Sequence, residues 1–184
     1  MENFNGLRVK ESEFALQKII MHEEKNLTVK FIICQSSNEG IYTFKGTITC
    51  DYQANENLQE RLRDLHQYLC LVRNIKEEKK RNVKVKGLEL SGSGDKENFK
   101  IYGIEISDKE KKMACDTYKI HYEDSEYMWV EEIRPIAKDI ELRVYKYLFA
   151  GEKAQLTLGV NEVEEDLEVT EVDFEESEQE EIEE

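Results

Sequence analysis

Lysines interleaved with aromatic residues recur along this chain, a combination that suits binding to a polyanion. The pattern occurs in VKF (29–31), YTFK (42–45), NFKIY (98–102) and YKIHY (118–122). Proteins that bind single-stranded nucleic acid line the phosphates with cations and stack bases on aromatic rings, each stacked base contributing roughly 1–3 kcal/mol. The alternative is that these residues simply form the solvent face of an antiparallel sheet. The predicted nucleic-acid-binding residues are Lys79, Lys80, Arg81, Lys84, Lys86, Lys100, Tyr102, Lys119 and Tyr122.

Sequence motifs for catalysis or metal binding are absent. The three histidines share no local motif with one another or with a cysteine, and the four cysteines form no CxxC pair. Zinc sites need such ligands at close, regular spacing. Dispersed carboxylates leave a magnesium-dependent nuclease as an alternative, although no segment argues for one. We therefore predict a protein that is not an enzyme and takes no cofactor, with unpaired cysteines that fit a cytoplasmic location.

The glycine-rich segment SGSGDKEN (91–98) could cradle a phosphate or close a hairpin. A phosphate-binding loop normally leads into a helix N-terminus, where backbone N–H groups face the anion. A strand pattern follows this segment instead, and it contains no GK[ST] motif. The sequence therefore favours a hairpin loop.

The strands expected on either side of this loop, 82–91 and 98–107, pair best in one antiparallel register. In that register Leu90 faces Phe99, Glu89 faces Lys100, and the same offset continues to the base of the hairpin. Cross-strand pairs of this kind contribute roughly 0.2–1 kcal/mol each. The register predicts that the apolar face changes sides at Gly87 and Gly103, which leaves two groups on opposite faces: Val83, Val85, Ile104 and Ile106 at the base, and Leu88, Leu90, Phe99 and Ile101 at the tip.

Two helices and further strands complete the expected fold. The apolar spacing predicts a helix over 57–79, capped by Asn57, and a second over 135–150 with Pro135 at its first position and Gly151 as its stop. Strands are expected at 14–22, 26–35 and 40–49, with 117–122 as an additional candidate. These elements predict an α+β domain in which two helices cover an antiparallel sheet of about five or six strands.

The net charge of −15 is concentrated at one end of the chain. Residues 161–184 contain 14 Asp and Glu and no Lys or Arg, which leaves 27 acidic and 26 basic residues in 1–160. We therefore predict one nearly neutral domain, 1–160, followed by a disordered acidic tail, 161–184, that serves as a solubiliser or a docking segment. No segment has the pattern of a signal peptide or a transmembrane helix, so no membrane partner is expected.

Residues 82–158 resemble a family of small uncharacterised proteins encoded by phages and prophages. The resemblance rests on VKVKGLELSGSGD, the hairpin return after it, an aromatic segment, and a helix ending in YLFAGEKAQLTL. It implies a phage source, a location in the host cytoplasm and a neighbourhood with replication or recombination functions. It supplies no active-site residues, and the acidic tail beyond Leu158 is a departure from the family.

A neutral domain with an acidic C-terminal tail is also similar in layout to phage and bacterial single-stranded-DNA-binding proteins, whose tails compete for the cationic groove and dock partner enzymes. We therefore predict a non-enzymatic single-stranded-DNA-binding or recombination-accessory protein. The alternative is a protein-interaction module, an adaptor or inhibitor of a host protein that could act as a nucleic-acid mimic. A homo-oligomer is compatible with both. A continuous positive strip on the folded surface would favour the first function, and interruption by Asp and Glu would favour the second.

Overall fold

The computed structural model describes residues 9–23, 26–38, 40–92, 96–107, 109–123 and 127–151. Part of the SGSGDKEN loop and the whole predicted tail, 161–184, lie outside the described residues. The elements are a 3-10 turn, η1 (Glu11–Glu13), the strands β1 (Phe14–Met21), β2 (Asn26–Ser37), β3 (Gly40–Gln53), β4 (Val83–Ser91), β5 (Asn98–Ile106), β6 (Lys112–Ala114) and β7 (Ile120–His121), and the helices α1 (Glu56–Asp64), α2 (His66–Val72), α3 (Glu77–Lys80) and α4 (Val130–Phe149).

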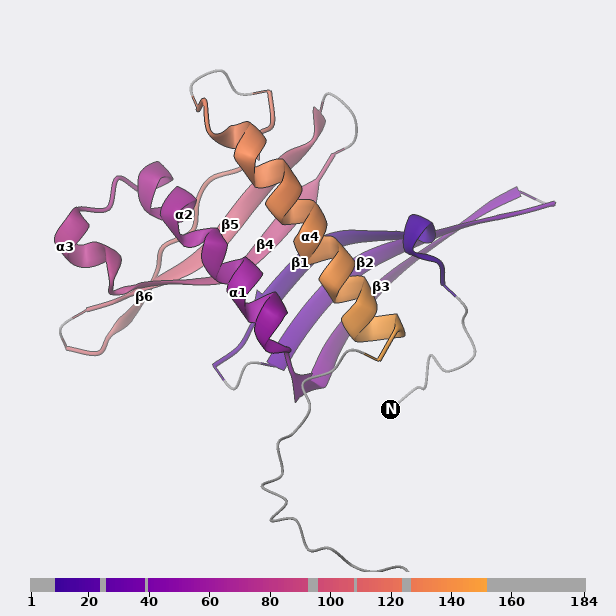
Figure 1. Cartoon of the computed structure of the whole chain (residues 1–184), viewed down its shortest axis with the longest axis horizontal. Helices are drawn as coiled ribbons and strands as arrows, with labels where there is room; N and C mark the ends of the chain where they lie inside the picture. The colour runs from indigo at the N-terminus through magenta and orange to yellow at the C-terminus, as the bar shows by residue number, and fades with distance from the viewer. Residues whose placement is uncertain are drawn as a thin grey trace, which may run out of the picture.

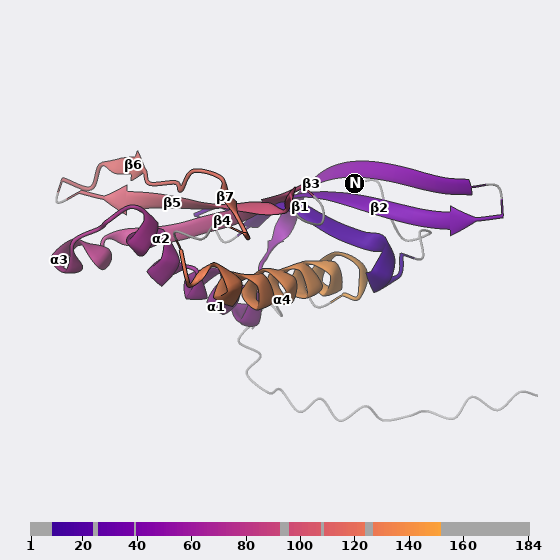
Figure 2. The same ribbon diagram turned by 90° about the horizontal axis from the view of Figure 1, so that it is seen from above.

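The strands form one antiparallel sheet, and the helices lie on one of its faces (Figures 1 and 2). The strand order is β3-β2-β1-β4-β5-β6, and β7 also pairs with β5. The predicted α+β class is therefore confirmed, with seven strands where about five or six were expected. The additional strand is β6, which is too short to produce a clear alternating pattern in the sequence, whereas β7 lies within the candidate strand 117–122.

Alternation of side chains along the strands creates the core between sheet and helices. In β2, Leu27, Val29, Phe31 and Ile33 are buried, while the residues between them point to the opposite face. The helix α4 contacts both α1 and β1. Its buried residues are Val130, Ile133, Ala137, Ile140, Val144 and Tyr147.

The prediction of one long helix over 57–79 was wrong, because this segment breaks twice. The first break is at Leu65, between α1 and α2. The second follows α2, where Asn74 adopts a left-handed conformation (φ 49°) and the Ile75 N–H bonds the Cys70 carbonyl at 2.9 Å. Asparagine tolerates this helix-ending conformation, so Asn74 stops the helix despite the helix-favouring charges that follow. The N-cap is Asn55, whose side chain accepts from the Leu58 N–H at 2.9 Å, and not Asn57.

The second helix begins earlier than predicted. It starts at Val130, so Pro135 lies inside α4 and not at its first position. The missing N–H of Pro135 removes one backbone bond from the second turn. Gly151 follows the helix at φ 76°, which confirms the predicted stop.

The predicted hairpin register holds at the tip and fails at the base. Leu90 faces Phe99 and Glu89 faces Lys100 as expected, but Val83 faces Glu105 and not Ile106. A bulge between Val85 and Gly87 shifts the pairing by one residue. Val83 and Val85 are consequently buried on the same face as Leu88, so the predicted change of apolar face along β4 was wrong.

Gly103, the second glycine of the hairpin, marks a close approach to a helix. A Cβ at this position would lie 2.4 Å from the Leu69 Cδ2 atom of α2. The absence of a side chain therefore lets α2 pack directly on β5.

The other strand predictions are confirmed with adjusted ends. The strands β1, β2 and β3 match the predicted 14–22, 26–35 and 40–49, although β2 continues to Ser37 and β3 continues to Gln53. Of the candidate strand 117–122, only Ile120 and His121 pair, with β5. None of the described helices combines the length and the apolar composition that crossing a membrane requires.

Candidate nucleic-acid interface

The face of the sheet that carries no helix, called the open face below, collects lysine side chains. The burial pattern and the register assign them: Lys30 lies between buried Val29 and Phe31, and Lys84 lies between buried Val83 and Val85. Because neighbouring residues of a strand point to opposite faces, these lysines point away from the helices. Among the described residues the open face holds the lysines 18, 30, 45, 84, 86, 100, 112 and 119 and the carboxylates of Glu23, Glu89 and Asp116.

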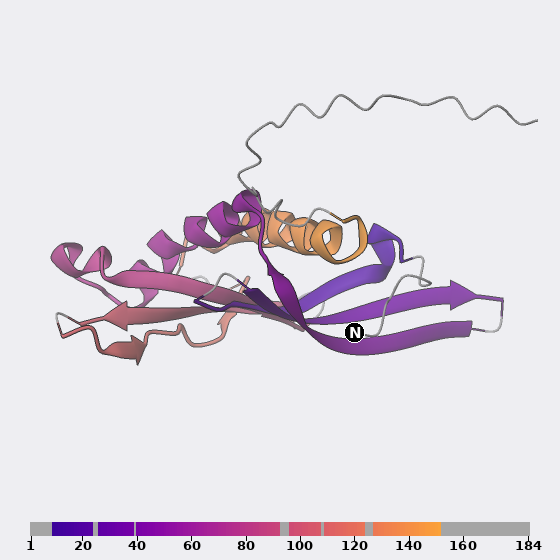
Figure 3. The same cartoon turned by 90° about the horizontal axis from the view of Figure 1, so that it is seen from below.

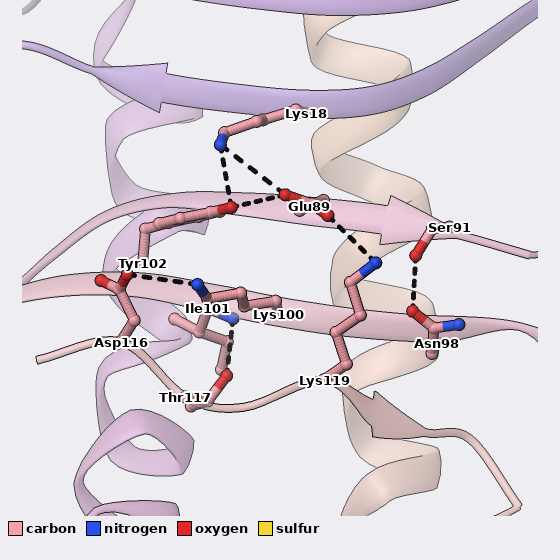
Figure 4. Close-up of polar contacts among 10 residues, drawn as sticks. All are labelled: Lys18, Glu89, Ser91, Asn98, Lys100, Ile101, Tyr102, Asp116, Thr117 and Lys119. Carbon is pink, nitrogen blue, oxygen red and sulfur yellow. Dashed lines mark hydrogen bonds and ion pairs between the residues drawn. The ribbon is translucent and has the colours of Figure 1, made fainter.

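A single cross-strand row forms the centre of this face. Lys30 faces Lys18, Lys18 faces Glu89, and Glu89 faces Lys100. Glu89 lies 3.6 Å from the Lys18 ammonium and 3.5 Å from that of Lys119, and Asp116 lies 3.3 Å from Lys100 (Figure 4). Two carboxylates thus neutralise part of the lysine charge at the centre of the open face.

The Tyr102 side chain is held within this row (Figure 4). Its hydroxyl donates to Glu89 Oε2 at 2.5 Å and accepts from Lys18 Nζ at 2.8 Å. The ammonium groups of Lys18 and Lys100 lie 4.0 and 4.5 Å from the ring centroid, within cation–π range. The ring is therefore already engaged by protein groups and offers little surface for a base.

Burial and these contacts shift the pKa values of Tyr102 and Glu89. Burial, followed by the hydrogen bond to Glu89, raises the pKa of Tyr102 to about 12. Burial alone would raise the pKa of Glu89, but the Tyr102 hydroxyl and the charges of Lys18 and Lys119 outweigh it and lower that pKa. At neutral pH the cluster therefore holds an ionised Glu89 and a protonated Tyr102.

The structure brings five of the nine predicted site residues together on the open face: Lys84, Lys86, Lys100, Tyr102 and Lys119. The remaining cations, Lys79, Lys80 and Arg81, belong to α3 and its end, on the side of the sheet that the helices occupy (Figure 3). Lys80 pairs there with Glu77 at 2.6 Å.

The prediction for Tyr122 needs a correction. Its side chain is only 7% exposed and packs against the Phe99 ring, at 5.1 Å between centroids, with the Arg134 guanidinium 4.5 Å away. Burial raises its pKa. A ring enclosed in this way cannot stack on a base, so Tyr122 is a core residue.

Four lysines of the open face were missing from the predicted site: Lys18, Lys30, Lys45 and Lys112. Lys30 and Lys45 carried a sequence signal, because they occur in VKF and YTFK. Lys18 reaches the site only through the pairing of β1 with β4, which no local pattern reveals. Lys112 pairs with Glu23.

Aromatic residues around the start of α4 form a second cluster that sequence reasoning missed. The Trp129 ring lies 5.3 Å from Tyr68 and 5.1 Å from Tyr127, and the Tyr127 hydroxyl contacts that of Tyr118. The segment YMWV was too short to predict as an element, and its neighbours come from other parts of the chain. This cluster ties α2 to the N-terminus of α4.

A pocket of about 270 Å³ opens where β1 and β4 diverge. These strands pair only at Lys18–Ile20, and beyond this point the Leu16 N–H donates to the Glu141 carboxylate of α4 at 2.7 Å. Arg134 in the same pocket pairs with Glu97 at 3.1 Å. The Arg134 Nε atom is nevertheless buried without a hydrogen-bond partner among the described residues, and burial raises the pKa of Glu141.

Within the described ranges, no group of three or more His, Cys, Asp and Glu side chains could hold a metal ion. The open face is the candidate interface because it gathers lysines from several strands of the described sheet. No protein-family model, no curated protein and no solved structure matches this chain.

Proposed function

We propose that this protein binds single-stranded nucleic acid on the open face of its sheet. The observation that carries the proposal is the segregation of charge. Residues 1–160 are nearly neutral, yet eight lysines and three carboxylates of the described residues share this face. An uncovered sheet with excess positive charge attracts phosphates. A phage origin and a role next to replication or recombination remain predictions.

The lysines without an ion-pair partner among the described residues would carry most of the binding. Lys30, Lys45 and Lys84 are exposed, and Lys30 directly faces another lysine, Lys18. Like charges opposite each other destabilise a sheet. A bound phosphate between these two side chains would remove that repulsion.

Electrostatic attraction should dominate over base stacking, because Tyr102 is engaged by Glu89, Lys18 and Lys100. Binding should consequently weaken steeply with salt and depend little on base sequence.

The test measures affinity for a labelled oligonucleotide as a function of salt, by fluorescence anisotropy. Replacement of Lys30, Lys45 and Lys84 together by alanine should reduce the slope of log K against log [salt] by about 2, since each lost contact to a single strand contributes roughly 0.7. A matched triple, with Arg63, Lys76 and Lys138 replaced by alanine, removes the same charge from exposed positions outside the sheet.

The comparison of these two triple variants separates a specific face from a general charge effect. If both variants lose the same affinity, the open face is not the interface. If a protein lacking residues 161–184 does not bind at about 50 mM salt, where phosphate contacts are strongest, the proposed function is wrong.

A protein-interaction module is the second candidate, and the interrupted charge in the central row of the open face favours it. Glu89 and Asp116 interrupt the lysines there, so the positive surface is divided. A divided charge pattern suits a folded protein partner with matching charges. Retention of a specific host protein by the wild type and its loss in the Lys30/Lys45/Lys84 variant, without oligonucleotide binding, would support this candidate. Nucleic-acid binding stays the first proposal because Lys30, Lys45 and Lys84 are exposed and have no ion-pair partner among the described residues.

A further inference from the structure

We propose that two copies of this protein pair antiparallel along the free edge of β3, which would join their sheets into one. This inference concerns the β3 edge of the sheet, which shares Lys45 with the open face, and it does not depend on nucleic-acid binding. It starts from the contrast between the two ends of the sheet.

The two sheet edges differ in how they are protected. At one end, β6 and β7 are only three and two residues long, and such short strands give a second chain little to pair with. At the other end, β3 is 14 residues long and has β2 as its one strand neighbour among the described residues. Alternate residues between Gly40 and Thr49 therefore direct their N–H and C=O groups away from β2, toward an edge along which no described strand lies.

The usual devices that block edge pairing are missing from residues 40–49 of β3, whereas a register shift against β2 and Asp51 follow this stretch. The register with β2 is unbroken from Thr49 to Gly40, so no bulge turns this edge away. Residues 40–50 contain no proline and one charged residue, Lys45. A long, regular edge of this kind is a template for strand addition.

Apolar side chains gather on the same strand. Ile41 is 76% exposed, Tyr42 55% and Phe44 48%, and this part of the β2–β3 hairpin projects past the helices (Figures 1 and 3). Of the eight large apolar residues that are exposed in the described part of the chain, four belong to β3. Pairing of two hairpins would bury this surface.

The sequence of β3 is complementary to itself around Thr43. A twofold axis there places Tyr42 of each copy opposite Phe44 of the other, on the face that also carries the helices. It places Thr43 opposite Thr43 and Ile41 opposite Lys45, whose aliphatic stem can cover it. Aromatic cross-strand pairs are among the more stabilising ones, and the two Lys45 side chains stay apart. This self-complementarity identifies the second copy as the partner.

The test uses opposite charges at one exposed position of the full chain. In the proposed register, Ile41→Glu faces Lys45 of the second copy twice, whereas Ile41→Lys places like charges there twice. We expect Ile41→Glu to associate roughly tenfold more tightly than Ile41→Lys. Sedimentation velocity of each variant, at protein concentrations between about 1 and 100 µM, measures the two dissociation constants.

Met128→Glu and Met128→Lys are the matched controls, because Met128 is 96% exposed and distant in sequence from β3. This second pair should show equal association, and circular dichroism checks that all four variants fold. A wild-type protein that stays monomeric throughout this range overturns the proposal. Equal dimer dissociation constants for Ile41→Glu and Ile41→Lys also overturn the proposal.

Discussion

Glu89 is the residue on which the polar network of the open face depends. It is 22% exposed and contacts two lysines and the Tyr102 hydroxyl. A carboxylate in this position stabilises the sheet, because it separates lysines that would otherwise repel one another. The same contacts reduce the charge available to a ligand, so folding stability and anion binding make opposing demands on this residue.

Replacement of Tyr102 by phenylalanine should lower the free energy of unfolding by about 1.5 kcal/mol at neutral pH, the lower value for a hydrogen bond to a charged group. The pKa of Tyr102, about 12, lies above the ordinary value of 10.0, so the folded state holds this proton more tightly than the unfolded chain does. Stability that is present below pH 10 is therefore lost as the pH rises toward 12. Urea unfolding across this range should show a shallower loss in Tyr102→Phe than in the wild type.

Lys84→Ala serves as the control for this measurement, because it is an exposed change on the same sheet that leaves the Tyr102 hydroxyl in place. Equal alkaline loss in Tyr102→Phe and the wild type would contradict the assigned role of the hydroxyl.

At the scale of elements, the β1–β4 junction joins two hairpin units into one sheet. These strands pair at only three positions, one of which is Ile20 with Gly87. The bulge at Lys86 lies beside this contact. It keeps Val85 and Leu88 on the buried face while Lys84 and Glu89 stay on the open face, so a local irregularity maintains both surfaces.

Gly87→Ala should destabilise the protein by about 2–3 kcal/mol, as expected for overpacking against a rigid group. The new Cβ would lie 2.0 Å from the Ile19 carbonyl oxygen and 2.9 Å from the Ile20 Cδ1 atom. Backbone cannot move aside as a flexible side chain can, so β1 and β4 must separate. The urea midpoint measures the effect, and Lys84→Ala, an exposed change on the same strand, is the control. Midpoints that agree for the two variants would show that the junction tolerates a side chain.

At the scale of the whole molecule, charge divides into a lysine-bearing face and an acidic C-terminal segment. The segment 161–184 contributes 14 negative charges and lies outside the described residues. Under the proposed function, this charge would repel phosphates and compete for the same lysines. The affinity of the full chain for nucleic acid would then be the net result of two opposing parts.

Deletion of residues 161–184 should tighten oligonucleotide binding at low salt, and the gain should shrink as salt screens the charges. Anisotropy titrations of the full and shortened chains at several salt concentrations measure this difference. A variant with the acidic residues of this segment changed to Gln and Asn keeps the length and is the matched control. Unchanged affinity in both variants would exclude competition by the segment.

Most of the elements could be predicted from the sequence, because they depend on local patterns. Alternation along β2 and β3, the tip of the β4–β5 hairpin and the stop at Gly151 follow from residue types a few positions apart. The sequence also predicted the residue types of the candidate site, because lysines alternate with aromatic residues in the expected strands. Asn74 is a residue type that can end a helix, so the sequence contained an indication of the break after α2. The apolar spacing on both sides of Asn74 nevertheless predicted a continuous helix.

The sequence alone determined the fold class, the tip register and the separation of acidic from basic charge. Only the tertiary structure decided which lysines share a face, because Lys18 meets Glu89 and Tyr102 through a pairing of strands about 70 residues apart. It also decided that Tyr122 is buried and that the bulge at Lys86 shifts the base register. Such features arise from packing between distant segments, which local spacing does not encode.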